Sequence, residues 1–483
     1  MLSRHGRSSR VIMFMSISGL LATGCNPFSK DNNNNNNNNN AILPQRVAPS
    51  DGVRWLLPED PACLDGKSSA TLSQVTIYEW DGTQAHEKQV AMSSKNDSDY
   101  GFQTKNIFFS MLGYEKNQTC TYDTDGLNCE DDKTQNNKSE QELRICHADG
   151  WYNRDSVEAM TLTAEYFTEL SYDFYNSIVG NKPGIVKSVI VSQPRLKMHI
   201  TRTSDKKVID MYETDNAAFT ATSSDSLGKI GVFMVHPTSV KSFDKGGVNL
   251  WEVPFVMHHE FGHHVFRHYL GSTADSIGLT LSDTGSIDGI LPRPKTRSKN
   301  DLNLTDSTKL AQDAADGINE TFADLFAYFT DNGVKDQLKG VECLDTIRDP
   351  SSPVYADGKK KGMDSASIEM YEGRKDAGTA KGCATPNFDD SHDIAAALGQ
   401  PIAQFIEMSF PNVDAKTRAR VLLSWAIRLN TLFTSTKSNI RIDNIVRELV
   451  LSVKDNTALR ADACAAFKAN ITGLPLATAA CAP

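Results

Sequence analysis

The sequence lacks several features that would assign it to common protein classes. It has no close Cys-x-x-Cys pair, which argues against a zinc ribbon, and it has no internal repeat. The apolar run near the N-terminus, residues 11–22, is too short to cross a bilayer as a helix. Basic residues number 50 against 60 acidic ones, and the formal net charge is −10. This acidic balance argues against nucleic-acid binding and against electrostatic adhesion to anionic lipid.

The remaining composition is that of an ordinary globular protein. Of the 483 residues, 39% are hydrophobic and 23% are charged, which is typical of neither a disordered nor a membrane-spanning chain. The length is sufficient for two or three domains with substantial cores.

The first residues form a segment for export. Arginines at positions 4, 7 and 10 precede the apolar run, and small residues lead to Cys25. The segment resembles a bacterial lipoprotein signal peptide, which implies cleavage of residues 1–24 and a lipid on the Cys25 sulfur. We therefore expect a lipid anchor in the bacterial cell envelope, and Asn26 in place of Asp favours the outer membrane. The alternative is plain secretion with an incidental cysteine.

Residues 25–50 predict a tether. They include an unbroken run of asparagines, Asn32–Asn40, which cannot bury apolar surface and has no periodicity. A flexible segment behind a lipidated cysteine would hold the folded body away from the membrane, and the lipid would be the only membrane contact. Cleavage at Cys25 would also remove three arginines and no acidic residue, which makes the mature chain more acidic still.

The other cysteines predict disulfides. Nine cysteines are present, so an even number remains beside Cys25, as is typical of exported proteins. Proximity along the chain suggests the pairs 120–129, 343–383 and 464–481, which leaves 63–146. Spacing alone leaves many other pairings open.

The chain divides into regions of different character. Residues 51–150 contain short strand-like runs at 73–80 and 105–114 and a polar loop at 123–140, so we expect a β-rich region with disulfides. Residues 151–332 form a predicted central lobe, 333–387 an irregular insertion, and 388–483 a helical C-terminal lobe.

Periodic patterns place the main elements of residues 151–332. Residues 156–179 have apolar positions at helical spacing, and Gly180 predicts the end of that helix. Strands are expected at 187–192, 195–202, 206–213 and 229–236. A helix is predicted from Pro254 to just before Gly271, then a polar loop over 272–312 and a second helix at 318–330. Helices are also expected at 394–410, 417–433, 440–453 and 459–471.

The stretch FVMHHEFGHHVFRHYLG, residues 255–271, contains one frame with metal-ligand spacing. His259 and His263 are four residues apart, so on a helix both imidazoles can reach one ion. Glu260 lies about 100° around the helix, where it can accept a proton from water whose pKa a bound metal lowers. The alternative is a histidine-rich helix with a chance match. His258 and His264, like His268, are not at ligand spacing and are expected at the surface or in packing.

A third ligand decides between these alternatives. Tyr269 stands where a metzincin would have histidine, so that arrangement is excluded. Glu320 and Asp324 are four residues apart beside an apolar stripe, where carboxylates are costly unless they are paired or metal-bound. Glu320 can complete a His₂Glu site, and Asp324 can accept the N–H of His259. The alternative is a solvated acidic edge of the second helix.

The motifs HHEFGHHVF and INETFADLF together resemble the gluzincin metallopeptidases, thermolysin-like enzymes in particular. The likeness extends to AEYFTELSYDFYNS, to the hairpin segments DNAAF and IGVFMVH, and to DDSHDIAAALGQPIAQF. It covers residues 156–270 and 311–475, loosely outside the motifs. It implies an α+β, thermolysin-like two-lobed fold, with a β-rich N-terminal lobe that carries the zinc helix and a helical C-terminal lobe. The hairpin would pair with an extended substrate.

The resemblance also implies roles for individual residues. His259, His263 and Glu320 match the zinc ligands, one Zn²⁺ per chain, Glu260 the general base, and Asp324 the partner of a ligand histidine. His392 matches the histidine that stabilises the oxyanion, with Asp389 or Asp390 to orient it; alternatively His392 caps a helix. The chain segment between His263 and Glu320 is longer than in thermolysin. The sequence shows no clear match to the family's calcium-binding acidic run, so Ca²⁺ has no support.

The sequence thus predicts a tethered zinc endopeptidase that acts on protein or peptide substrates. Two other functions are considered: a zinc-binding surface lipoprotein without activity, and a zinc aminopeptidase. The aminopeptidase would need a Gly-x-Met-Glu-Asn-type segment, and none is found.

Overall fold

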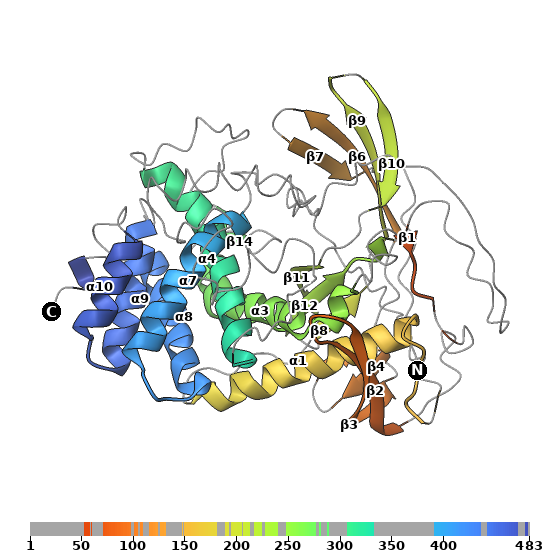
Figure 1. Ribbon diagram of the computed structural model, residues 1–483. Coiled ribbons are helices and arrows are strands. Elements are labelled where there is room, and N and C mark those ends of the chain that lie inside the picture. The colour runs from red at the N-terminus through yellow and green to blue at the C-terminus, as the bar shows by residue number, and fades with distance from the viewer. Residues whose placement is uncertain are drawn as a thin grey trace, which may run out of the picture.

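The structure is a computed structural model that combines helices with mostly antiparallel sheets, as the α+β prediction states (Figure 1). It describes residues 53–57, 59, 71–97, 101–104, 107–109, 115–123, 126–131, 147, 149–180, 189–192, 195–204, 206–212, 217–224, 228–239, 248–276, 280–281, 287–288, 307–332, 391–435, 442–471 and 479–481.

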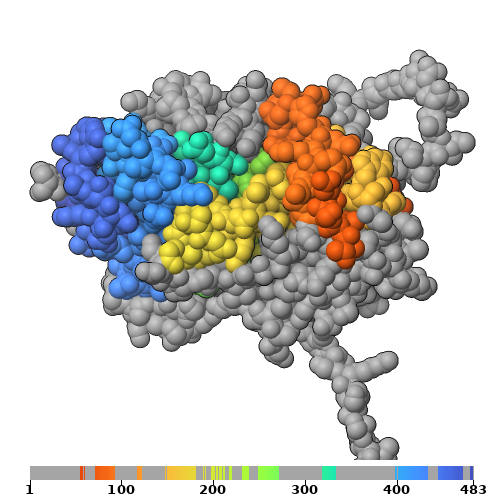
Figure 2. Space-filling view, turned by 90° about the horizontal axis from the view of Figure 1, so that it is seen from below, coloured from red at the N-terminus to blue at the C-terminus, as the bar shows by residue number. Residues whose placement is uncertain are grey.

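A long buried helix, α1 (Val157–Val179), connects the β-rich part to the C-terminal helices. It begins where predicted, because the Ser156 side chain accepts a hydrogen bond from the Ala159 N–H. It ends at Gly180, whose φ of 56° is positive, and glycine adopts a positive φ at little cost. In Figure 2, α1 is the yellow surface between the blue C-terminal helices and the orange strands β2 (Thr71–Trp80) and β3 (Ala85–Asp97).

Two four-stranded sheets lie in the N-terminal half of the chain. One has the order β2-β3-β4-β5, with β4 at Gly101–Thr104 and β5 at Ile107–Phe109. The other has the order β10-β9-β6-β7, with β6 at Glu115–Asp123, β7 at Gly126–Asp131, β9 at Arg195–Arg202 and β10 at Val208–Tyr212. The second sheet joins strands from both sides of residue 150, through the parallel pairing of β6 with β9.

A third sheet, of order β11-β12-β8, lies beside the central helices. It consists of β8 (Val189–Ser192), β11 (Ala217–Ser224) and β12 (Gly228–Val235). The predicted strands near 187–192 and 229–236 are confirmed as β8 and β12, and those at 195–202 and 206–213 as β9 and β10. A two-residue strand β1 (Val53–Arg54) pairs with β13 (Thr238–Ser239).

Helix α3 extends from Pro254 to Ser276, and α4 from Ser307 to Thr330. The predicted stop at Gly271 was therefore wrong, because a single glycine weakens a helix without ending it. The predicted loop over 272–312 was also wrong in part: besides the end of α3 it contains the short strands β14 (Thr280–Leu281) and β15 (Ile287–Asp288), and α4 begins within it. A short 3-10 turn, η2 (Leu250–Glu252), precedes α3.

The predicted polar loop at 123–140 was wrong over Gly126–Asp131, which is strand β7. Polar residues there pair with β6 across an antiparallel ladder. Cys120 of β6 is disulfide-bonded, and Cys129 lies opposite it in that ladder. The predicted pairs 63–146 and 343–383, and the insertion at 333–387, lie outside the described residues.

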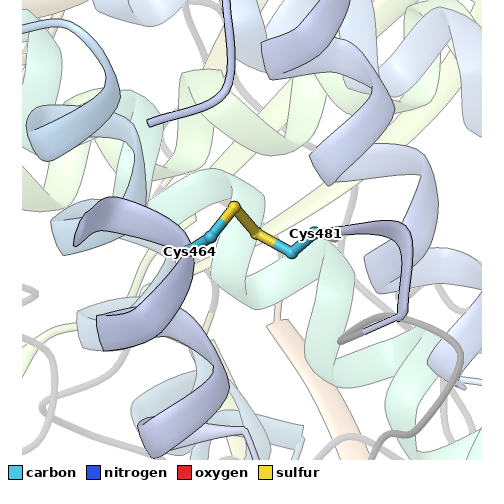
Figure 3. Close-up of a disulfide and its surroundings, with 2 residues drawn as sticks. All are labelled: Cys464 and Cys481. Carbon is cyan, nitrogen blue, oxygen red and sulfur yellow. A yellow bond between two sulfur atoms is a disulfide. The ribbon is translucent and has the colours of Figure 1, made fainter. Parts of the chain in front are cut away.

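The C-terminal helices follow the predicted pattern. They are α7 (Ser391–Ser409), α8 (Ala415–Ser435), α9 (Ile442–Asn456) and α10 (Ala461–Asn470). The predicted disulfide between Cys464 and Cys481 is confirmed, and it attaches the last described residues to α10 (Figure 3). In the part of the chain that the structure describes, no helix is both long and apolar enough to cross a membrane.

Candidate metal centre

Two histidines of α3 and one glutamate of α4 converge on a single point inside the molecule. The Nε2 atoms of His259 and His263 lie 2.8 Å apart, and an oxygen of Glu320 lies 3.3 Å and 3.4 Å from them. All three side chains are buried. Three donor atoms this close together can bind one metal ion, and among the described residues they form the one such group.

The helices bring these donors together for a simple reason. Residues i and i+4 of a helix lie on one face, which puts His259 and His263 side by side on α3. Helix α4 packs against α3 through Phe322, which contacts Phe266, and through Phe326, which contacts Phe261. Burial of these aromatic rings drives the two helices together and carries Glu320 to the histidines.

The second ring nitrogen of each histidine also has a partner on α4. His259 Nδ1 lies 2.9 Å from an Asp324 oxygen, the contact expected from the sequence. His263 Nδ1 lies 3.1 Å from the Asn319 side-chain oxygen. An Nδ1–H that donates to oxygen leaves the Nε2 lone pair directed at the shared point, which is the tautomer that a metal ligand needs.

Asn319 was not predicted as a site residue. It directly precedes Glu320, so it lies about 100° around α4 from that ligand and reaches the other histidine. An amide next to a candidate ligand, on a helix that faces two imidazoles, was the available indication.

Phe219 of strand β11 covers one face of the site. Its ring stacks on that of His263 with centroids 5.9 Å apart and an interplanar angle of 26°, and it also contacts His264. The sheet therefore restricts the rotation of the His263 ring from the side opposite to α4.

The charge of a neighbouring carboxylate changes the pKa of His263. Burial alone would lower the pKa of its imidazole, but the nearby Glu320 carboxylate outweighs this and raises the pKa above its ordinary value. Without a metal ion, therefore, the carboxylate favours a proton on the same nitrogen that would bind a metal.

Glu260 is buried next to His259, on the turn that carries the candidate ligands. The other histidines of this stretch have different surroundings. His258 lies 2.6 Å from the Ser171 hydroxyl and 3.2 Å from Asp331, so it connects α1 to the end of α4. His264 packs against Phe219 and Phe261. Both are therefore packing residues rather than members of the ligand cluster, as expected.

The structure describes the remaining predicted site residues only in part or not at all. His392 lies in the first turn of α7, and its side chain is outside the described part. Asp389 and Asp390 also lie outside the described residues. No protein-family model matches the chain, and no curated protein matches its sequence.

Proposed function

We propose that the protein is a zinc-dependent endopeptidase. The observation that carries the proposal is the buried His259–His263–Glu320 cluster, in which both Nδ1 atoms are occupied by oxygen partners and Glu260 lies beside the ligands. A carboxylate next to two ligand histidines on one helix is typical of metal-assisted hydrolysis.

The donor set supports zinc. About 3.3 Å separates neighbouring ligand atoms that are held about 2.0–2.1 Å from one tetrahedral ion. The two distances from Glu320, 3.3 Å and 3.4 Å, agree with this, and the 2.8 Å between the two Nε2 atoms is about 0.5 Å shorter. Two imidazoles argue against calcium and magnesium, which prefer oxygen. The same donors also bind ferrous iron in oxygenases, but a buried carboxylate placed as a proton acceptor favours hydrolysis.

The chemistry then divides between the ion and the chain. When bound, zinc would lower the pKa of a water molecule and polarise the substrate carbonyl. Glu260 accepts the proton of the attacking water and passes it to the nitrogen of the leaving amine, which breaks the peptide bond. By resemblance to the gluzincins, His392 donates a hydrogen bond to the developing oxyanion. His392→Ala should then slow hydrolysis and leave zinc affinity unchanged.

Strand β11 supports action on extended peptides. It is the last strand of the order β11-β12-β8 among the described strands, and its residue Phe219 contacts the ligand His263. An edge strand offers backbone groups that an extended chain can pair with. A substrate bound in this way would pass the metal in mid-chain, which favours an endopeptidase over an aminopeptidase.

The proposal includes the thermolysin-like arrangement of two lobes and the export of the protein with a lipid on Cys25. A rival proposal is a zinc-binding surface lipoprotein without catalytic activity. Both would bind zinc, so the distinction depends on cleavage.

A peptide-library digest with purified residues 41–483 tests the function. We expect internal cleavage that a chelator abolishes and that zinc, but not iron, restores. The matched control is Glu260→Gln, which keeps all three ligands. Stoichiometric zinc without cleavage of any peptide would favour the non-catalytic lipoprotein, and iron in place of zinc would reject a zinc peptidase.

A further inference from the structure

At Gly262, a residue without a side chain, helix α3 lies close against the backbone of α4. A Cβ atom at Gly262 would lie 2.7 Å from the Ala323 Cα, 3.1 Å from its carbonyl oxygen and 3.2 Å from its Cβ. Non-bonded carbon atoms prefer about 3.5–4.0 Å. Any side chain at position 262 would therefore push the backbone of α4 away by roughly 1 Å.

This contact lies within the ligand set of the candidate metal centre. Gly262 directly precedes His263, and Ala323 directly precedes Asp324. The contact thus sets the distance between the helix that carries both imidazoles and the helix that carries Glu320 and Asp324. Metal–ligand distances must be held to about 0.2 Å, so a shift of this size would take the carboxylate out of reach of a shared ion.

We propose that Gly262 is a positioning residue for the metal centre: its missing side chain sets the separation of α3 and α4 that lets His259, His263 and Glu320 bind one ion. Glycine inside a helix is unfavourable relative to alanine, so position 262 carries a local cost that the close approach explains. The inference rests on the metal site of the proposed function, but not on peptide cleavage.

Two other glycines supply matched controls. Gly399, inside α7, has open space where a Cβ would lie, so Gly399→Ala should be tolerated. Gly150 has a φ of +66°, and a Cβ there would lie 2.3 Å from the carbonyl oxygen of Gln74 in β2, so Gly150→Ala should disturb the fold away from the metal ligands. The first control measures the effect of alanine alone, and the second measures the combined effect of backbone strain and a steric clash at a distance from the metal ligands.

The experiment compares full-length metal-free wild type with Gly262→Ala, Gly399→Ala and Gly150→Ala. Each is titrated with zinc, and then with cobalt(II), whose visible d–d bands report the number and geometry of ligands. Thermal unfolding of each metal-free protein is measured in parallel. We expect Gly262→Ala to lose at least about tenfold in zinc affinity, as misplaced ligands usually do, and to change its cobalt spectrum. Gly150→Ala should unfold more easily and keep the wild-type spectrum.

A wild-type cobalt spectrum and zinc affinity in Gly262→Ala would overturn the proposal. If Gly262→Ala does not fold, Ala323→Ser enlarges the same contact from the α4 side by one atom. It should then show the same spectral change in weaker form, and an unchanged spectrum would equally overturn the proposal. Absence of cobalt binding by the wild type would instead reject the metal centre itself. If Gly262→Ala shows the expected change in its cobalt spectrum but the wild type cleaves no peptide, only the proposed reaction would be rejected.

Discussion

Two helices each carry a pair of buried carboxylates four residues apart, and the two pairs meet different surroundings. On α4, Glu320 and Asp324 are 5% and 2% exposed and face the imidazoles of α3. On α1, Glu165 and Glu169 are 0% and 5% exposed, and neither oxygen of Glu165 has a hydrogen-bond partner among the described residues.

The difference shows that spacing and burial alone do not make a metal site. A buried carboxylate is costly unless something neutralises it. On α4 the histidines, and a metal ion shared with them, can do so. On α1 burial, reinforced by the negative charge of Glu169, raises the pKa of Glu165 well above its ordinary value, so a proton neutralises the carboxylate.

The largest expected difference between the two pairs is in hydrolysis. Glu320→Ala should reduce peptide cleavage to the level of the chelated protein, because it removes a metal ligand. The matched variant Glu165→Gln, also at a buried glutamate of a central helix, should keep wild-type cleavage. A digest of one peptide by both variants measures this, and equal activity in the two would remove the distinction between the pairs.

The general base should have the next largest effect. Glu260→Gln keeps the size of the side chain and all three ligands but cannot accept a proton. Turnover should fall by about 10²–10⁴-fold while zinc content stays at the wild-type level. Steady-state kinetics together with metal analysis measure this, and undiminished turnover would exclude Glu260 from the mechanism.

The oxygen partners of the histidines should have a smaller effect. Asp324→Ala and Asn319→Ala each free one Nδ1 atom, so the ligand ring is less well oriented. We expect zinc affinity to fall about 10–100-fold in each, less than in Glu320→Ala. A competition titration with a chromophoric chelator gives the order of the three variants. A greater loss in Asn319→Ala than in Glu320→Ala would contradict the assignment of Glu320 as the ligand.

The smallest effect is on stability and concerns Glu165. The unfolded chain releases the proton of the Glu165 carboxyl near the ordinary glutamate pKa of 4.5, while the folded protein retains that proton to higher pH. Between those two values the unfolded state binds fewer protons, so the free energy of unfolding falls as pH rises, by at most about 1.4 kcal/mol per pH unit. Glu165→Gln should remove this contribution.

Urea unfolding at pH 5 and pH 8 measures this contribution as the difference between wild type and variant. Glu87→Gln, at an exposed position of β3, is the control and should keep the wild-type dependence. The same pH dependence in Glu165→Gln and wild type would mean that Glu165 does not hold its proton in the folded protein.

Local patterns predicted the centre of the site. The i, i+4 spacing of His259 and His263, and that of Glu320 and Asp324, needs only helical geometry, and the four side chains do meet. Two other contacts between α3 and α4 were not predicted. Asn319 becomes a partner of His263, and Gly262 a contact point, only once α3 and α4 cross.

The strands show the same limit. Strand β12, apolar from Ile230 to Val235, was predicted, whereas β3 and β7 are largely polar and were not. Such strands form because a neighbouring strand provides backbone groups for hydrogen bonding, as β6 does for β7. The neighbouring strand cannot be identified from local composition. Helix α4 begins at Ser307, in a polar stretch that had been predicted as a loop.

The most direct test of the central claim is an equilibrium zinc titration of the wild type and of Glu320→Ala. A His₂Glu centre predicts one tightly bound zinc ion per wild-type chain and a strong loss of affinity in the variant, since only two of the protein's three ligands remain. Wild-type zinc affinity in Glu320→Ala would mean that the histidine pair takes its third ligand elsewhere, and it would contradict the thermolysin-like account of this protein.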